Sequence, residues 1–133
     1  MFDPKIRVLI VNEMTTMRKL VVDACREIGM TDLTEASNVA EAWQKMGETQ
    51  SPYGVVISEW EMTQATGIDL LKRIRRDSKL GNTPFILLTS EAGKSKIVEA
   101  AKSGVSAYIV KPFTPDVLKE KIQTALEKPI KPI

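Results

Sequence analysis

The 133-residue sequence contains no histidine, and this absence excludes several kinds of chemistry. Without histidine there is no Ser-His-Asp triad, no imidazole metal ligand and no phosphohistidine relay within the chain. The single cysteine, Cys25, lies in an amphipathic pattern that predicts a helix, so we interpret it as a reduced core thiol. A reduced thiol fits a cytoplasmic protein.

Long apolar runs and a strong charge imbalance are also lacking. No stretch approaches the roughly 20 apolar residues of a membrane span, and the first five residues are not those of a secretory signal. The formal net charge of +2 is too small to indicate nucleic-acid binding. We interpret the basic cluster Lys72, Arg73, Arg75 and Arg76 as a solvated helix end near the negative pole of the helix dipole. We therefore expect neither a membrane nor a nucleic acid as partner.

Five apolar runs alternate with helical patterns along the chain. The runs cover residues 6–11, 33–36, 54–58, 85–88 and 107–110, and helical patterns follow from Thr15, Asn38, Gly67, the region before Ile97, and Thr114. This alternation predicts βαβ units and a parallel sheet covered on both faces. Among the apolar positions we expect to face inward are Leu20, Trp43 and Val117. We expect one domain, residues 1–128, and a short C-terminal tail, residues 129–133.

Polar side chains follow four of the predicted strands directly. They are Asn12 and Glu13 after the first strand, Glu59 and Glu61 after the third, Thr89 and Ser90 after the fourth, and Lys111 after the fifth. In open α/β sheets, ligands bind beyond the carboxyl ends of the strands, where the strand order reverses. The sequence therefore predicts a site of acids, a hydroxyl and a lysine at this edge.

The strand-end sequences resemble the receiver domain of bacterial response regulators, of the single-domain, CheY-like type. The resemblance rests on Val8-Leu9-Ile10-Val11-Asn12-Glu13, Val56-Ile57-Ser58-Glu59-Trp60, Leu88-Thr89-Ser90-Glu91-Ala92 and Ala107-Tyr108-Ile109-Val110-Lys111-Pro112-Phe113. It runs from about Lys5 to Glu127. It implies a flavodoxin-like, doubly wound five-stranded parallel sheet of order 2-1-3-4-5, with helices on both faces.

The resemblance also implies roles for individual residues. In this family, two acids after the first strand help to bind Mg²⁺, and an aspartate after the third strand accepts a phosphoryl group. A hydroxyl and a lysine hold the phosphoryl oxygens. The acid pair falls on Asn12 and Glu13, the phosphoacceptor position on Glu59, and the switch residues on Thr89, Tyr108, Lys111 and Pro112, the last two joined by a cis peptide bond.

The departures from the family pattern cluster at the phosphorylation chemistry. Glu59 replaces the aspartate and places its carboxylate about 1.5 Å further out, and a misplacement of roughly 1 Å can cost a hundredfold in rate. Asn12 replaces a charged oxygen ligand that Mg²⁺ prefers. Glu13, Glu59 and Glu61 against Lys111 still sum to −2, so we expect a weak Mg²⁺ site at these three glutamates, or none.

The longer side chain of Glu59 also has a constructive interpretation. It moves negative charge toward Lys111 and Thr89, so Glu59 is predicted to mimic phospho-aspartate in part. An exposed ion pair supplies about 0–1 kcal/mol, whereas complete switching needs about 5.5 kcal/mol. We interpret the chain as a phosphorylation-independent pseudo-receiver of a two-component or chemotaxis-type pathway, and not as an enzyme.

The predicted output is binding of another protein. The resemblance places the contact face on the helix after Ser90, the strand around Tyr108 and the helix from Thr114. Its lysines, Lys94, Lys96, Lys102, Lys119 and Lys121, suit an acidic partner. The alternative is a Mg²⁺-dependent, phospho-accepting receiver of a phosphorelay, with a sensor kinase as partner. A small α/β enzyme would need a nucleophile–base pair or a cofactor loop, and a DNA-binding regulator would need an effector domain.

Overall fold

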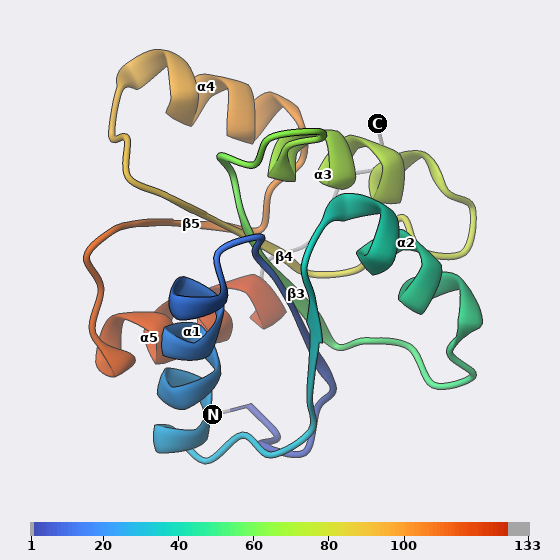
Figure 1. Ribbon diagram of the computed structural model, residues 1–133, viewed down its shortest axis with the longest axis vertical. Helices are drawn as coiled ribbons and strands as arrows, with labels where there is room; N and C mark the ends of the chain where they lie inside the picture. The colour runs from blue at the N-terminus through green and yellow to red at the C-terminus, as the bar shows by residue number, and fades with distance from the viewer. Residues whose placement is uncertain (1, 128–133) are drawn as a thin grey trace.

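The computed structural model describes residues 2–127, in which strands and helices alternate strictly (Figure 1). The strands are β1 (Val8–Val11), β2 (Leu33–Ala36), β3 (Val55–Glu59), β4 (Phe85–Thr89) and β5 (Ala107–Val110). The helices are α1 (Thr15–Glu27), α2 (Val39–Glu48), α3 (Gly67–Arg76), α4 (Lys94–Lys102) and α5 (Pro115–Glu127). The predicted domain boundary at residue 128 and the tail 129–133 lie outside the described residues.

All strand pairs are parallel, and the order in the sheet is β2-β1-β3-β4-β5. Helices α1 and α5 lie on one face of the sheet, and α2 and α3 lie on the other together with α4 (Figure 1). The predicted flavodoxin-like fold is confirmed. No helix within the described residues has both the length and the apolar content needed to cross a membrane.

The alternation of side chains along the strands divides the core into two layers. On β1, Val8 and Ile10 pack with α1 and α5, whereas Leu9 and Val11 pack with α2 and α3. Each of these four side chains is buried. Because both faces are covered, the strands are apolar at nearly every position, which is why the sequence shows continuous runs rather than a polar–apolar alternation.

The start of α3 is fixed by two local features that also shape the carboxyl edge of the sheet. Thr66 and Asp69 form a capping box, in which each side chain accepts the other residue's backbone N–H. Gly67 follows, and a Cβ there would lie 2.4 Å from the carbonyl oxygen of Glu59 and 2.8 Å from Leu87 Cδ2. Only glycine lets α3 begin this close to β3, and this proximity confines the loop 60–66.

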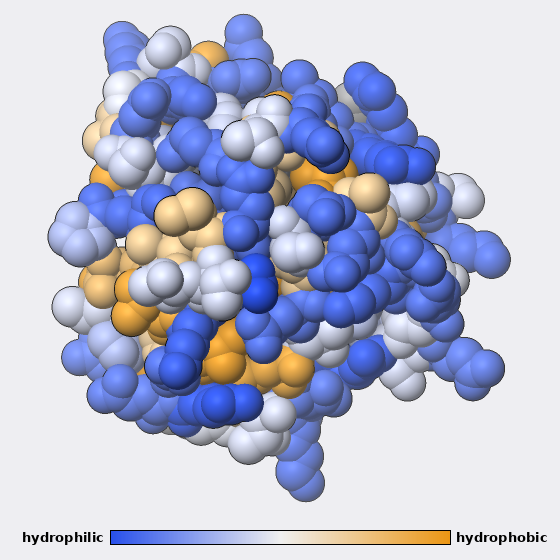
Figure 2. All heavy atoms as spheres, in the orientation of Figure 1, coloured by the Kyte–Doolittle hydropathy of each residue, from blue (hydrophilic) through white to orange (hydrophobic). Residues whose placement is uncertain are grey.

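Two apolar positions that the pattern placed inside are exposed. Leu20 is 53% exposed and Val117 is 37% exposed, because the packed faces of their helices centre on neighbouring residues such as Val21 and Leu118. Leu20 borders a groove of about 440 Å³ between α1 and the β5–α5 connection. Its lining is Met17, Leu20, Asp23, Ala24, Glu27, Lys111, Pro112, Phe113 and Pro115. Figure 2 shows hydrophobic atoms reaching the surface over this side of the molecule.

The interpretation of the basic cluster as a solvated helix end is wrong for Arg75. The interpretation of Trp43 as an inward-facing residue is confirmed only in part. Arg75 is 4% exposed, and its guanidinium donates to the carbonyl oxygens of Gly104 and Thr83 at 2.9 and 2.6 Å. It follows Leu71 by four residues and so shares the inward face of α3. Trp43 is only partly buried, and the guanidinium of Arg73 lies 4.3 Å from its ring centroid.

Candidate functional site

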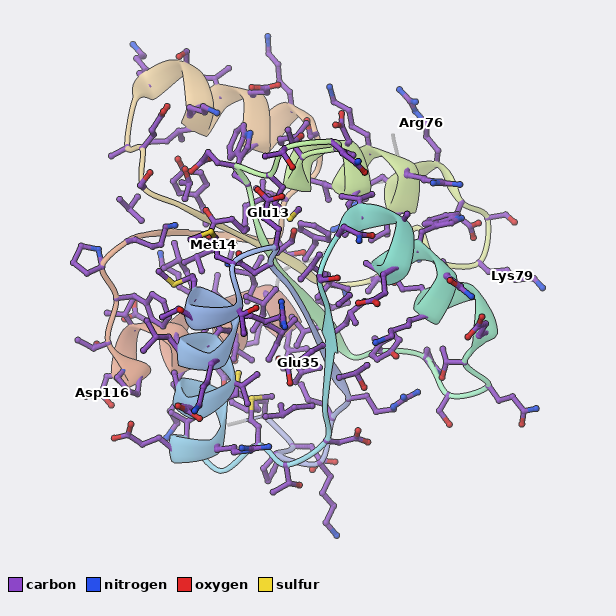
Figure 3. The ribbon with its side chains drawn as sticks, in the orientation of Figure 1. Glu13, Met14, Glu35, Arg76, Lys79 and Asp116 are labelled. Carbon is purple, nitrogen blue, oxygen red and sulfur yellow. The ribbon has the colours of Figure 1, made fainter. Side chains whose placement is uncertain are left out.

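The predicted polar residues do meet at the carboxyl edge of the sheet. Strands β1 and β3 are neighbours there, and the chain turns toward β2 on one side and toward β4 on the other. This is the topological switch point of the sheet. Figure 3 labels Glu13 and Met14 where β1 passes into α1, opposite the loop that follows β3. Asn12 also follows β1, and the other site residues come from the ends of β3, β4 and β5 and from the loop after β3.

Glu59 is buried at the end of β3 and is paired with Lys111. The side chain is 4% exposed, and Lys111 Nζ donates to Oε1 at 3.0 Å and to Oε2 at 2.9 Å. Asn12 Nδ2 donates to Oε1 at 3.1 Å, while Asn12 Oδ1 accepts the backbone N–H of Met14 at 2.9 Å. The Lys111–Pro112 peptide bond is cis, as the resemblance implied.

Burial raises the pKa of Glu59 above its usual value, and the negative charge of Glu61 adds to this increase. The hydrogen bonds and positive charge of Lys111, together with the Asn12 hydrogen bond, oppose it. Desolvation disfavours the carboxylate, whereas the ammonium and amide donors stabilise it. Glu59 therefore lies in an environment that disfavours its charged form, and the donors of Lys111 and Asn12 stabilise that form.

Thr89 hydrogen-bonds to Glu61 and, within the described residues, makes no hydrogen bond to Glu59. Thr89 Oγ1 donates to the carboxylate of Glu61, with distances of 2.9 Å to Oε1 and 2.8 Å to Oε2. The backbone N–H of Ser90 donates to Glu61 Oε1 at 3.3 Å. Glu61 thus takes the contact with Thr89 that the sequence analysis assigned to Glu59.

The third glutamate of the site, Glu13, hydrogen-bonds to Thr63. Its Oε2 accepts the backbone N–H of Thr63 at 3.2 Å and the Thr63 hydroxyl at 2.8 Å. The three glutamates that we expected around a weak Mg²⁺ site therefore bind three different groups: Thr63, Lys111 and Thr89. In the described part of the chain, no group of three or more acidic, cysteine or histidine side chains is placed to hold a metal. As arranged, the three carboxylates do not form one shared three-ligand site.

Tyr108 lies beside this cluster, on β5. Its hydroxyl donates to the backbone carbonyl of Glu91 at 2.5 Å, and its ring meets Trp60 edge to face, with centroids 6.2 Å apart. Burial raises the pKa of Tyr108, and the charges of Glu61 and Glu91 add to the shift. Lys96 Nζ of α4 lies 4.2 Å from the centroid of the Trp60 ring. The aromatic pair therefore links the site to α4 and β5.

The sequence predicted which residues gather but not all of their pairings. The contacts of Glu59 with Lys111 and of Asn12 with the same carboxylate come from residues already singled out. The Glu61–Thr89 bond was missed, because loop 60–66 turns back toward β4 and no periodic pattern specifies that turn. The only sequence signal for it is the position of Glu61 two residues beyond a strand end.

Comparisons with known proteins agree with this geometry. Residues 8–123 match the family model "Response regulator receiver domain". The chain is 40% identical over 120 residues to the chemotaxis protein CheY1 of Helicobacter pylori, covering 90% of this chain and 96% of that protein. It is 38% identical over 120 residues to a chemotaxis protein CheY homolog of Campylobacter jejuni, covering 90% and 92%.

Solved structures share the fold. The chemotaxis protein CheY4 of Vibrio cholerae superposes with a TM-score of 0.83 at 29% identity, covering 92% of this chain and 99% of that one. A CheY-like response regulator receiver domain protein of Methanospirillum hungatei superposes with a TM-score of 0.79 at 23% identity, covering 92% and 94%. Receiver domains of this type are signalling modules rather than classical enzymes. The chain belongs to the response regulator receiver domain family and is a CheY-like member of it.

Proposed function

We propose that this chain is a pseudo-receiver, which signals in a two-component or chemotaxis-type pathway by binding another protein without being phosphorylated. The observation that carries the proposal is the buried pair of Glu59 and Lys111. Both carboxylate oxygens of Glu59 accept hydrogen bonds from the Lys111 ammonium. Hydrogen bonds from an ammonium lower the nucleophilicity of a carboxylate, and the extra methylene of Glu59 displaces its oxygens from the position of the family's aspartate.

The same pair supports a partial mimicry of phospho-aspartate by Glu59. In the family, the lysine after the fifth strand binds a phosphoryl oxygen, and here Lys111 binds Glu59 instead. The pair is more buried than an exposed surface ion pair, with side-chain exposures of 21% for Lys111 and 4% for Glu59. Less solvent screening makes the contact stronger than an exposed pair. Full switching would still need about 5.5 kcal/mol, so a partner completes it.

The face proposed for the partner consists of α4, β5 and α5. It carries exposed apolar side chains on each element: Ile97 on α4, Val110 on β5 and Val117 on α5. The two helices also carry lysines, namely Lys94, Lys96, Lys102, Lys119 and Lys121. Apolar side chains together with these lysines favour a partner that presents apolar side chains among carboxylates. Tyr108, between α4 and α5, joins this face to the Glu59 site.

Acetyl phosphate tests the proposal. Native protein incubated with acetyl phosphate and Mg²⁺ should show no gain of one phosphoryl group by intact-mass analysis. Glu59→Asp should gain some, and Asn12→Asp combined with Glu59→Asp should gain most, because these changes restore the acceptor length and the charged oxygen ligand. Glu59→Gln in the native background is the unreactive control.

The opposite outcome has a clear signature. If the native chain takes up a phosphoryl group with Mg²⁺ and Glu59→Gln abolishes the uptake, the chain is a phospho-accepting receiver of a phosphorelay. Labelling that survives Glu59→Gln but still needs Mg²⁺ would place the acceptor elsewhere and would equally overturn the proposal.

A further inference from the structure

We propose that Glu61 is a positioning residue that holds the switch hydroxyl of Thr89 and, through it, Tyr108. Glu61 lies outside the covalent chemistry expected of the site, yet it makes more contacts with the end of β4 than any other acid of the pocket. Both of its oxygens lie within 2.9 Å of Thr89 Oγ1, and Oε1 also accepts the backbone N–H of Ser90. Charge-assisted hydrogen bonds of this kind are about twice as strong as neutral ones.

The two glutamates divide between them the contacts expected of a single phosphoryl group. Glu59 takes Lys111 at the end of β5, and Glu61 takes Thr89 and Ser90 at the end of β4. Two carboxylates carry up to two negative charges, close to the about −1.5 to −2 of a phosphoryl monoester at neutral pH. Glu59 supplies the contact to Lys111, and Glu61 supplies the contact to Thr89 that Glu59 does not make within the described residues.

Hydrogen bonds on either side of the Glu91 backbone connect Glu61 to Tyr108. Thr89 Oγ1 donates to Glu61 and accepts the backbone N–H of Glu91 at 3.1 Å. The carbonyl of Glu91 accepts the Tyr108 hydroxyl at 2.5 Å. Coupling between separate groups travels through contiguous contacts of this sort when the elements have two arrangements.

Trp60 provides a second connection between Glu61 and Tyr108. It precedes Glu61 in the sequence, and its indole packs edge to face against Tyr108. Tyr108 is therefore held at its hydroxyl through Glu91 and at its ring through Trp60. Removing the Glu61 carboxylate weakens the connection through Thr89 and Glu91 to the Tyr108 hydroxyl. Tyr108 then samples a second position.

Fluorine NMR of Tyr108 tests the inference. The chain has two tyrosines, so 3-fluorotyrosine in a Tyr53→Phe background reports on Tyr108 alone. The native background should give one resonance. Glu61→Ala should shift and broaden it or split it, because the ring then exchanges between positions. Glu61→Gln keeps an acceptor oxygen for Thr89 and should restore most of the native signal.

Three further variants separate this coupling from general effects. Glu13→Ala removes an acid of the same pocket whose one hydrogen-bonding partner among residues 2–127 is Thr63, and it should leave the Tyr108 resonance in place. Thr89→Val removes the hydroxyl at nearly constant volume and should reproduce the effect of Glu61→Ala. In the double variant the two effects should not add, since both break the same link.

Two results would overturn the inference. One is a Tyr108 resonance in Glu61→Ala that stays within the native line width. The other is an equal shift from Glu61→Ala with and without the Thr89 hydroxyl, which would mean a direct effect of charge on the ring. The inference rests on the proposed function only in treating Thr89 and Tyr108 as the switch, and it is read out without phosphate. Phosphorylation of Glu59 would refute the pseudo-receiver proposal and leave this result standing.

Discussion

Replacing Lys111 with Met is expected to lower the free energy of unfolding by about 3–5 kcal/mol near pH 8, the cost of leaving one member of a buried ion pair without its partner. Met retains most of the lysine's apolar stem, so the change chiefly removes the ammonium. Among the described residues, Glu59 would then keep one side-chain donor, Asn12 Nδ2, for a carboxylate that is 4% exposed.

The loss should depend on pH, and its direction follows from the raised pKa of Glu59. A carboxyl group with a higher pKa in the folded than in the unfolded protein holds more protons when folded. Stability from such a group is complete below the unfolded pKa and is lost as the pH rises through the folded pKa. Lys111 is the largest influence that lowers the pKa of Glu59, so the variant should lose stability more steeply above pH 4.5 than the native protein does.

Urea unfolding at about pH 5 and pH 8 measures this difference. The penalty of Lys111→Met should be smaller at the lower pH, because the raised pKa of Glu59 means that more of this carboxyl is protonated there than at pH 8. Glu59→Gln combined with Lys111→Met is the matched control, since it removes both charges. It should be more stable than Lys111→Met at pH 8 and should lose the pH dependence. An equal penalty at both pH values, unchanged by Glu59→Gln, would show that the pair contributes little.

The fold was predictable because its two signals are local and repeated. Strands covered on both faces leave continuous apolar runs, such as Val55 to Ile57, and helix starts carry caps such as Asn38, whose side chain accepts the N–H of Glu41. The ordered set of strand ends then predicted which residues meet. The exact inward face of each helix was less certain, because neighbouring apolar positions such as Leu20 and Val21 fit the same period while only one of them packs.

The pairings within the site were only partly predictable. Glu59 is the last residue of β3 and Lys111 follows β5, so the parallel sheet brings both side chains to its carboxyl edge. Glu61 lies in an irregular loop whose path depends on the tight approach of Gly67 to β3. A sequence without an alignment does not specify that path, and the partner of Thr89 was therefore assigned to Glu59. Side chains on regular elements can be paired from topology, whereas those on loops need the structure.

Arg75 gives the second large expected effect, at the end of the sheet away from the site. Arg75→Met should lower the free energy of unfolding by about 3 kcal/mol, since it removes four hydrogen bonds from a charged donor, each worth about 1.5–3 kcal/mol when fully buried, and three of them are only part-buried. Its guanidinium donates to the carbonyls of Gly104, Gly81 and Thr83 and to Ser106 Oγ. These acceptors come from the loops that enter β4 and β5, so Arg75 joins the two loops.

Burial also lowers the pKa of Arg75, to about 10, and no acidic side chain in residues 2–127 forms a salt bridge with it. The stabilisation therefore comes from the fork of guanidinium donors rather than from an ion pair, and Arg75→Lys, with a single ammonium group, should recover only part of it.

Arg76 offers a matched control for Arg75 on the same helix. It is exposed and projects away from the body of the protein (Figure 3), so Arg76→Met should change the free energy of unfolding by no more than about 0.5 kcal/mol. Urea unfolding of the three variants measures the contrast. Similar values for Arg75→Met and Arg76→Met would contradict a role of the guanidinium in joining the two loops.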